Sequence, residues 1–249
     1  MNGNDFDLYN TPQGLKPVSS PIKREILNFL GSGAKTQREV MLSIARAQST
    51  TARHLLELEA AGLVKSSVDS ADSRRKLYNI SGRLAATGGK LTEAFSSYFT
   101  QTISDGLTSK APLMERINHS LRYVTESWGL SLDAMLREVG REIGAQIAGS
   151  LNGSSELDSV IDDLSIFWKN NSMGVIEKQK NDPLVLRIEG NYDCTGVPDV
   201  GKPLCALDEG IMEGVLEKTV GGDWKVHEFA CHGTGQNHCL FKIVPLEAG

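Results

Sequence analysis

Apolar positions recur at helical spacing early in the chain and predict two short helices. The first stripe runs over residues 22–30 and follows Ser20 and Pro21, a pair that favours a helix start. Gly31 lies where the stripe ends and is typical of a helix end. The next apolar run, over residues 37–44, predicts a second and shorter helix.

Capping residues indicate a helix-turn-helix arrangement here. Thr36 and Glu39 have the spacing of a capping box at the start of the second helix. Ser49 is expected to cap a third helix over residues 50–61, which Gly62 ends. The turn between the second and third helices is tight, as in DNA-binding helix-turn-helix motifs.

Strand-like residues then predict a β-hairpin. Residues 63–68 and 74–80 flank the polar turn 69–73. Three helices followed by a hairpin form a winged helix-turn-helix, in which the hairpin is the wing and carries a basic rim. We expect this fold over residues 19–83, after a loose arm over residues 1–18.

Positive charge is concentrated in this part of the chain. Residues 20–90 hold twelve Lys and Arg against six Asp and Glu, a formal charge of +6, whereas the whole chain carries −5. Double-stranded DNA is the anionic partner that such a motif fits. The residues expected to touch DNA lie at the start of the third helix and on the wing: Ser49, Thr50, Thr51, Arg53, His54, Arg74, Arg75 and Lys76.

The segment STTARHLLELEAAGLVKSSVDSADSRRKLYNIS, residues 49–81, resembles the ArsR-type winged-helix families. The resemblance implies that the third helix is the recognition helix, which enters the major groove, while the wing bases contact phosphates. Two alternatives stay open. Some winged helices mediate protein contacts instead, and His54 either reads a base or packs its ring against the helix.

Two further apolar stripes, over residues 91–107 and 114–128, predict helices that interrupt near Pro112. We expect residues 84–111 to form a dimerisation helix or linker, because the aromatic side chains of a lone helix would be exposed. A two-fold dimer would place two recognition helices one DNA turn apart. The alternative is that both stripes pack inside one chain.

The remainder, residues 112–249, predicts an α+β domain with an antiparallel sheet. Gly140, Gly144 and Gly149 recur in a predicted helix over residues 132–151, and we expect them to let this helix pack closely on a sheet. The other elements are expected as helices over residues 156–170 and 202–218 and as strands over residues 174–179, 183–189, 224–229 and 240–244.

The four cysteines all lie in the last quarter of the chain: Cys194, Cys205, Cys231 and Cys239. The polar, acidic N-terminus has no signal-peptide pattern and no run of 18 apolar residues exists, so we expect a cytoplasmic protein that is not in a membrane. In that compartment clustered cysteines favour metal or redox chemistry over structural disulfides.

The segments IEGNYDCTGVPDVGKPLCALDEGIMEGVLEKTVGG and VHEFACHGTGQNHCLFKI resemble the 4-vinyl reductase family domain, over residues 112–246. In phenol-responsive activators with this domain, the cysteines that match Cys205, Cys231 and Cys239 bind a structural zinc together with an upstream glutamate. Leu184 stands at the corresponding position here and cannot bind a metal. The resemblance therefore leaves the fourth ligand open, with Cys194 as the best replacement and Glu189 as the second.

A winged helix joined to this domain resembles the MsvR-type transcription regulators of methanogenic archaea. The resemblance implies a homodimer whose four cysteines, which are also the expected zinc ligands, control DNA binding by oxidation. A thiolate pair can hold zinc or form a disulfide with loss of the metal. The alternatives are a permanent zinc site, four unligated core cysteines, and a sensor of a small apolar ligand. We expect no enzyme, since neither a nucleotide-binding motif nor a catalytic constellation can be assembled.

Overall fold

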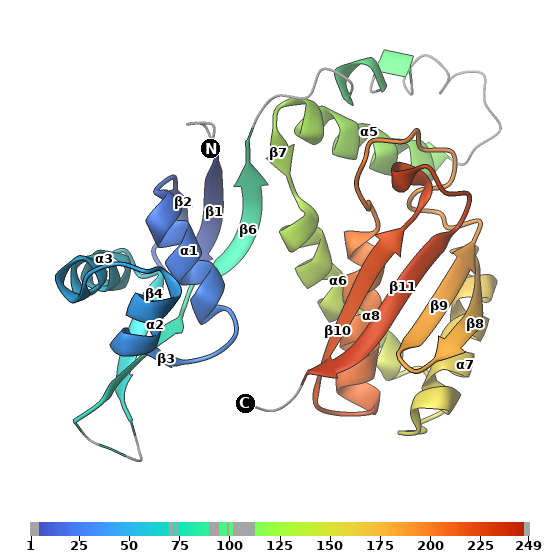
Figure 1. Ribbon diagram of the computed structural model, residues 1–249. Helices are drawn as coiled ribbons and strands as arrows, with labels where there is room; N and C mark the ends of the chain where they lie inside the picture. Colours follow the sequence, from blue (N-terminus) through green and yellow to red (C-terminus); the bar gives the residue numbers. More distant parts are fainter. Residues whose placement is uncertain are drawn as a thin grey trace. The chain divides into compact units, whose positions relative to one another are not determined.

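The computed structural model describes residues 5–69, 72, 74–89, 95–98, 100–101 and 113–246 (Figure 1). The chain divides into two compact units, Met1–Lys90 (unit 1) and Leu91–Ala248 (unit 2). Each unit combines helices with antiparallel strand pairs, so the protein belongs to the mixed α+β class. Within the described ranges, no helix combines the length and apolar character that a membrane span requires.

Unit 1 contains the three predicted helices α1 (Pro21–Leu30), α2 (Gln37–Ser43) and α3 (Gln48–Ala60). The capping box at α2 is confirmed, because the Glu39 N–H donates to Thr36 Oγ1 at 3.3 Å and the Thr36 N–H donates to the Glu39 carboxylate at 2.7 Å. The predicted cap of α3 is wrong. The helix begins one residue before Ser49, since Ala47 takes the extended backbone of the N-cap position.

A three-stranded sheet completes this part of unit 1. The predicted hairpin is confirmed as β4 (Val64–Val68) and β5 (Lys76–Ile80), which pair in antiparallel fashion. The short strand β3 (Lys35–Thr36) adds to the other side of β5, which gives the order β3-β5-β4. The hairpin therefore connects back to the start of α2.

The expected loose arm is wrong for the residues that the structure describes. β1 (Phe6–Thr11) pairs with β2 (Gly14–Val18) and with β6 (Arg83–Gly88), so residues 84–88 also belong to unit 1 rather than to a linker. Tyr9 and Val18 are buried in the core beside the three helices. The polar composition of the segment hides the alternation that buries every second residue of β1.

Unit 2 confirms the predicted C-terminal α+β domain. Its sheet has the order β10-β11-β9-β8 with antiparallel neighbours, and helices lie behind it in Figure 1. The helices are α5 (Leu113–Ser127), α6 (Asp133–Ala148), α7 (Leu157–Asn170) and α8 (Ala206–Thr219). The strands are β7 (Leu130–Ser131), β8 (Val175–Asn181), β9 (Leu184–Glu189), β10 (Asp223–Ala230) and β11 (Cys239–Leu246).

Glycines bring α6 and α8 into backbone contact. A Cβ atom at Gly140 would lie 2.3 Å from the Leu207 carbonyl oxygen, and one at Gly144 would lie 2.1 Å from the Ile211 carbonyl oxygen. The expectation that these glycines pack a helix on a sheet is therefore wrong. The partner is another helix, whose own glycines at the same four-residue spacing could not be matched to them from the sequence alone.

Some of the aromatic residues expected at a dimer interface pack inside unit 2. Phe95 and Tyr123 are buried, with ring centroids 6.1 Å apart. Ile117, Leu121 and Trp128 stay exposed, and Trp128 exposes 67% of its surface. Four residues of the first predicted stripe lie outside the described residues: Leu91, Phe99, Ile103 and Leu107.

Candidate functional site

The four cysteines meet in the core of unit 2 and are called here the cysteine cluster. Cys194 lies in the loop after β9, Cys205 at the N-cap of α8, Cys231 after the end of β10 and Cys239 at the start of β11. The β10–β11 turn and the pairing of Cys239 with Ile188 on β9 bring these distant segments together. Each cysteine exposes 1% of its surface or less.

The sulfur atoms lie within reach of a shared ligand or of one another. Cys194 Sγ lies 3.1 Å from Cys239 Sγ, and Cys205 Sγ lies 3.9 Å from Cys239 Sγ. The sulfurs of Cys194, Cys205 and Cys231 lie within 4.8 Å of one another. None of the four cysteines, all of which are described, forms a disulfide.

Glu228 adds a carboxylate to the cysteine cluster. Its Oε2 accepts hydrogen bonds of 3.0 Å from the backbone N–H groups of Leu204 and Cys205, while its Oε1 is buried and has no hydrogen-bond partner in the described structure. One carboxylate oxygen lies within 4.8 Å of the sulfurs of Cys205 and Cys239. A buried oxygen without a partner is costly, so this atom has room for a proton or a cation.

Sequence reasoning missed Glu228, although a signal was present. Along β10 the side chains of Trp224, Val226 and Glu228 alternate into the core. A glutamate at an inward position of a strand is unusual and calls for a partner. That pattern, rather than distance along the chain from Cys205, identifies the carboxylate.

Burial and neighbouring thiols change the acidity of the cluster. Burial raises the pKa of the Cys205 thiol well above its ordinary value and raises the pKa of Glu228 to about 8. A hydrogen bond with Cys194 raises the pKa of Cys231, whereas a hydrogen bond from Cys194 lowers the pKa of Cys239. Negative charge therefore settles most readily on Cys239, because its thiolate accepts hydrogen bonds from its neighbours.

The donor set fits a soft, thiophilic metal ion. Zinc bonds thiolates at about 2.3 Å, so sulfurs around one zinc are separated by about 3.8 Å. The 3.9 Å separation of Cys205 and Cys239 matches this value, and the buried Oε1 of Glu228 offers a further donor. With Glu228 the site has five candidate donors for the four positions of a structural zinc.

A buried ion pair holds the loop that carries Cys194. Arg122 on α5 donates to both carboxylate oxygens of Asp193, at 2.8 and 3.0 Å, and to its carbonyl oxygen at 2.9 Å. Both side chains are buried, so neither charge can be removed alone without leaving the other unpaired. Asp208, beside Cys205, accepts a 2.7 Å bond from Asn191, and burial raises its pKa well above the usual range.

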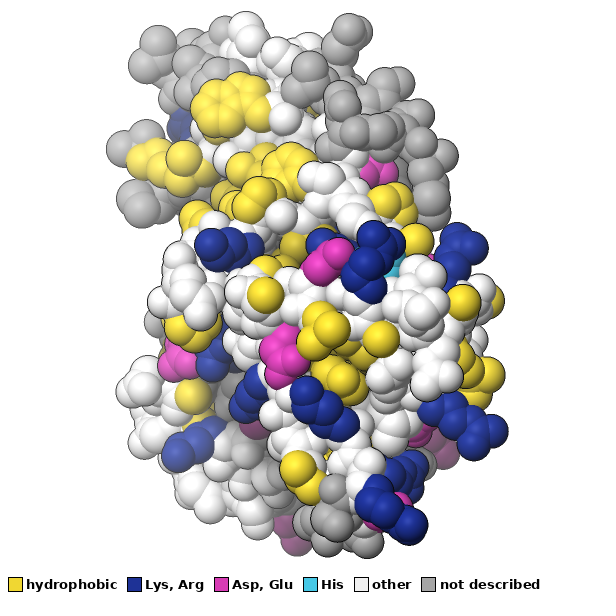
Figure 2. All heavy atoms as spheres, turned by 90° about the vertical axis from the view of Figure 1, so that its left-hand side faces the viewer, with side chains coloured by type: hydrophobic (Ala, Val, Ile, Leu, Met, Phe, Trp, Pro, Cys, Tyr) yellow, Lys and Arg dark blue, Asp and Glu magenta, His cyan; other side chains and the backbone are white. Residues whose placement is uncertain are grey.

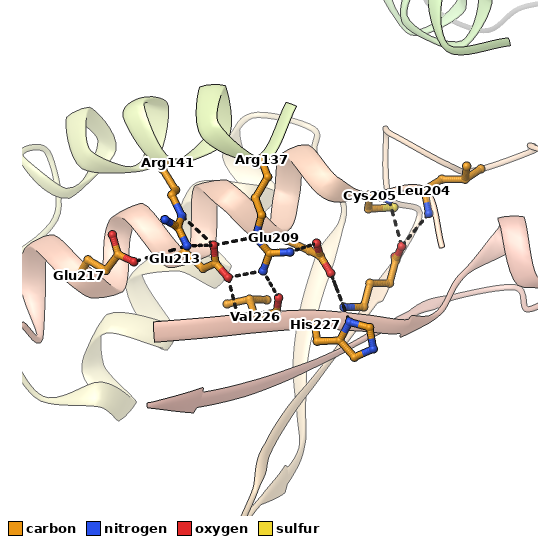
Figure 3. A network of polar contacts seen from close by, with 10 residues as sticks. Arg137, Arg141, Leu204, Cys205, Glu209, Glu213, Glu217, Val226 and His227 are labelled. Carbon is orange, nitrogen blue, oxygen red and sulfur yellow. Dashed lines mark hydrogen bonds and ion pairs between the residues drawn. The ribbon is translucent and has the colours of Figure 1, made fainter. Parts of the chain in front are cut away.

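A second buried network, shown in Figure 3, joins the cluster to α6. The Glu228 N–H donates to Glu209 Oε1 at 2.7 Å, and Arg137 on α6 donates to Glu209 Oε2 at 2.6 Å. Glu213 accepts from Arg137 and from the Val226 N–H at 2.9 Å. These side chains satisfy the open edge of β10, which has no neighbouring strand on that side among the described residues.

The other expected ligand positions lie away from the cluster. Glu189 is exposed and pairs with Arg187 at 2.5 Å. Leu184 is buried at the opposite end of β9, where it pairs with Ile243. Of the two sequence-based replacements for a fourth ligand, only Cys194 joins the cluster in the described structure.

Unit 1 carries a second candidate site, a basic groove of about 630 Å³ between α2, the start of α3 and the hairpin. Four of its lining residues are cations and none is an acid. The lining residues are Thr36, Gln37, Arg38, Met41, Gln48, Arg74, Arg75 and Lys76. The three wing bases predicted to touch DNA therefore lie together on this groove.

The predicted residues of α3 divide into two groups. Ser49 and Arg53 are exposed and Thr50 is half-buried, so these three can meet a partner. Thr51 is fully buried and donates to the Ala47 carbonyl oxygen at 3.1 Å, and His54 is buried beside Glu57. The expectation that Thr51 and His54 face outward is wrong, because they lie on the side of the helix that packs on unit 1.

Residues 184–245 match the family model of the 4-vinyl reductase domain. The chain is 36% identical over 81 residues to "Uncharacterized protein MJ1642" of Methanocaldococcus jannaschii, which is 32% of this chain and 50% of that protein. It is 31% identical over 83 residues to "Uncharacterized protein MJ0745" of the same organism, which is 32% of this chain and 44% of that protein. The chain thus spans about half the length of these curated relatives.

Two solved structures are also similar. A vinyl-4-reductase family protein from Methanocaldococcus jannaschii aligns over 64% of this chain and 99% of its own, with 16% identity and a TM-score of 0.40. The phenol-responsive sensory domain of the transcription activator PoxR, with phenol, aligns over 53% of this chain and 74% of its own, with 15% identity and a TM-score of 0.43. On the family match, the C-terminal part of this chain is a 4-vinyl reductase domain, and the cysteine cluster lies within it.

Proposed function

We propose that this chain is a DNA-binding transcription regulator whose cysteine cluster changes DNA binding when its thiols are oxidised. The observation that carries the proposal is the 3.1 Å separation of Cys194 Sγ and Cys239 Sγ in a buried cluster, in a chain that also has a basic helical unit. We assign no catalytic residue.

The DNA-binding part of the proposal rests on unit 1. Its order of three helices followed by a hairpin is that of a winged helix-turn-helix, with α3 as the recognition helix. Ser49 and Arg53 are exposed near the start of α3, where side chains enter the major groove. The basic groove lies beside them.

The metal part of the proposal assigns zinc to the cluster. Cys205, Cys231, Cys239 and Glu228 would hold it, and Cys194 remains as the surplus thiol. Bound zinc would fix the four segments of the fold relative to one another. Leu204 and Cys205 orient the Glu228 carboxylate through their backbone N–H groups.

The redox step joins the two closest sulfurs. A peroxide takes two electrons from the thiols of Cys194 and Cys239, an S–S bond forms between them, and the two thiol protons leave in two water molecules. Cys239 is the more acidic partner, because its thiolate is stabilised by Cys194 and Cys205. The disulfide removes Cys239 from the metal donors and tightens the loop of Cys194 against β11.

We further propose that the regulator acts as a homodimer. Exposed apolar residues recur at helical spacing on α5, as Ile117, Leu121 and Trp128, and on α6, as Met135 and Val139. Exposed apolar faces of this kind support association with a second copy. A two-fold dimer would present two recognition helices to a palindromic operator.

Replacement of Cys194 tests the redox step. Cys194→Ser should keep zinc and DNA binding in the reduced protein but lose the response of DNA binding to hydrogen peroxide, because Cys239 has no partner at 3.1 Å. Mass spectrometry of peptic fragments should detect a Cys194–Cys239 disulfide only in the oxidised native chain.

Cys231→Ser is the matched control for this experiment. It removes a thiol of the same cluster while leaving the Cys194–Cys239 pair, so the disulfide should still form. A Cys194→Ser protein that still responded to peroxide would contradict the proposal. Unchanged DNA binding in the oxidised native chain, with zinc retained, would favour a structural zinc site and a small apolar ligand as the signal.

A further inference from the structure

The basic groove differs from the rest of the surface of unit 1 in having cations on every side. Arg38 enters it from α2, and Arg74, Arg75 and Lys76 enter it from the hairpin. Lys and Arg side chains outnumber Asp and Glu on the side of the molecule shown in Figure 2. An unscreened set of cations in a groove attracts an anion with several oxygen atoms.

The wing bases are partly neutralised within the unit itself. Arg74 Nε lies 3.2 Å from Asp72 Oδ1, and Arg75 Nη1 lies 4.0 Å from Asp69 Oδ2. Lys76 Nζ likewise lies 3.7 Å from a carboxylate oxygen of Glu59 on α3. A phosphate that approaches these bases has to compete with a carboxylate already in place, so each wing base contributes less net attraction than its charge suggests.

Arg38 has no such competitor. It is exposed, and none of the residues that the structure describes forms an ion pair with it. Its position is fixed relative to the recognition helix, because the neighbouring Gln37 side chain donates to the Gln48 carbonyl oxygen at 3.4 Å. The planar guanidinium can donate two parallel hydrogen bonds to a phosphate group.

We infer that the basic groove receives a backbone phosphate of DNA and that Arg38 on α2, rather than the wing, is its principal anchor. The inference rests on the proposed DNA binding and deepens it by naming the contact. Gln48 lines the groove and begins α3, so a duplex whose major groove holds α3 brings its flanking phosphates to this position. Arg38 then sets the register of the helix on the duplex without reading sequence.

The test is the salt dependence of DNA binding by the full chain, measured by fluorescence anisotropy on a labelled duplex from the region upstream of its own coding sequence. Each phosphate contact contributes about 0.9 to the slope of log K against log salt. Arg38→Ala should lower the slope by about 0.9 and weaken binding about tenfold at 0.15 M salt. Arg38→Lys should keep the slope, because the charge remains, and weaken binding less.

Two matched variants separate this contact from general charge effects. Lys65→Ala removes an exposed base of unit 1 outside the groove and should leave the slope unchanged. Asp72→Asn keeps the acceptor for the Arg74 N–H but removes the competing charge, so it should strengthen binding. Arg74→Ala should lower the slope less than Arg38→Ala does.

The outcomes distinguish the inference from the proposed function. A chain that binds DNA with a slope unaffected by Arg38→Ala overturns the inference and leaves DNA binding intact. A larger loss from Arg74→Ala than from Arg38→Ala also overturns it, since the wing would then be the anchor. Failure of the native chain to bind any duplex, reduced or oxidised, overturns both.

Discussion

At the scale of single residues, the cysteine cluster depends on a carboxylate that water cannot reach. Glu228 exposes 1% of its surface, and one of its two oxygens has no hydrogen-bond partner in the described structure. Its pKa of about 8 means that it is largely protonated at neutral pH when no cation is bound. A metal ion that replaces this proton would stabilise the charged carboxylate.

Glu228→Gln tests this role. The amide oxygen still accepts from the Leu204 and Cys205 N–H groups, but the side chain no longer offers an anionic donor, so zinc affinity should fall by roughly tenfold or more. Zinc has to displace protons from Glu228 and from Cys205, whose pKa values burial raises. Native affinity should therefore rise between about pH 6 and pH 8, and rise less in the variant.

Competition with a chromophoric zinc chelator measures both effects. Glu189→Gln is the control, because Glu189 is exposed and was the second ligand expected from the sequence. Its zinc affinity should equal that of the native chain. A loss in Glu189→Gln without a loss in Glu228→Gln would contradict the assignment.

At the scale of elements, α6 and α8 form a rigid pair beside the cluster. Gly140 and Gly144 on α6 face Gly210 and Gly214 on α8, with no room for a side chain at any of the four. Arg137 crosses from α6 to Glu209 and Glu213 next to the contact (Figure 3). Packing and ion pairs therefore act together to fix α6 against the strand that carries Glu228.

Gly144→Ala should destabilise unit 2. The added methyl group would lie 2.1 Å from the Ile211 carbonyl oxygen, and backbone has to move to accept it, at a cost of about 1–3 kcal/mol of unfolding free energy. Gly149→Ala serves as the control, because its nearest contact would be 3.4 Å and its backbone is helical. Urea unfolding followed by tryptophan fluorescence measures both. Equal midpoints for the two variants would contradict close packing at Gly144.

The elements differ in how far the sequence predicts them. The period of the apolar residues identifies α1, α2, α3 and α8, because each buries one face against a core that its own pattern marks. The hairpin β1–β2 escapes prediction, since Asp7 and Thr11 occupy inward positions and mask the alternation around Tyr9. Asp7 is tolerated there because Arg24 lies 3.1 Å away, a long-range contact that no local pattern encodes.

At the scale of the whole molecule, two kinds of chemistry share one chain. Unit 1 concentrates positive charge around a groove, and unit 2 concentrates thiols in a 4-vinyl reductase domain. The sequence predicts this division, because charge and cysteines are unevenly distributed along it. It does not predict that Thr51 and His54 are buried or that Glu228 joins the cysteines, since both depend on how neighbouring elements pack.

The most direct test of the account is DNA binding by the full chain in dithiothreitol and then after mild oxidation, with zinc and free thiols counted in the same samples. We predict that loss of two thiols per chain changes the DNA affinity by a factor between about 5 and 150, the usual range for coupled sites. Loss of the same two thiols with an unchanged affinity would contradict control of DNA binding by the cysteine cluster.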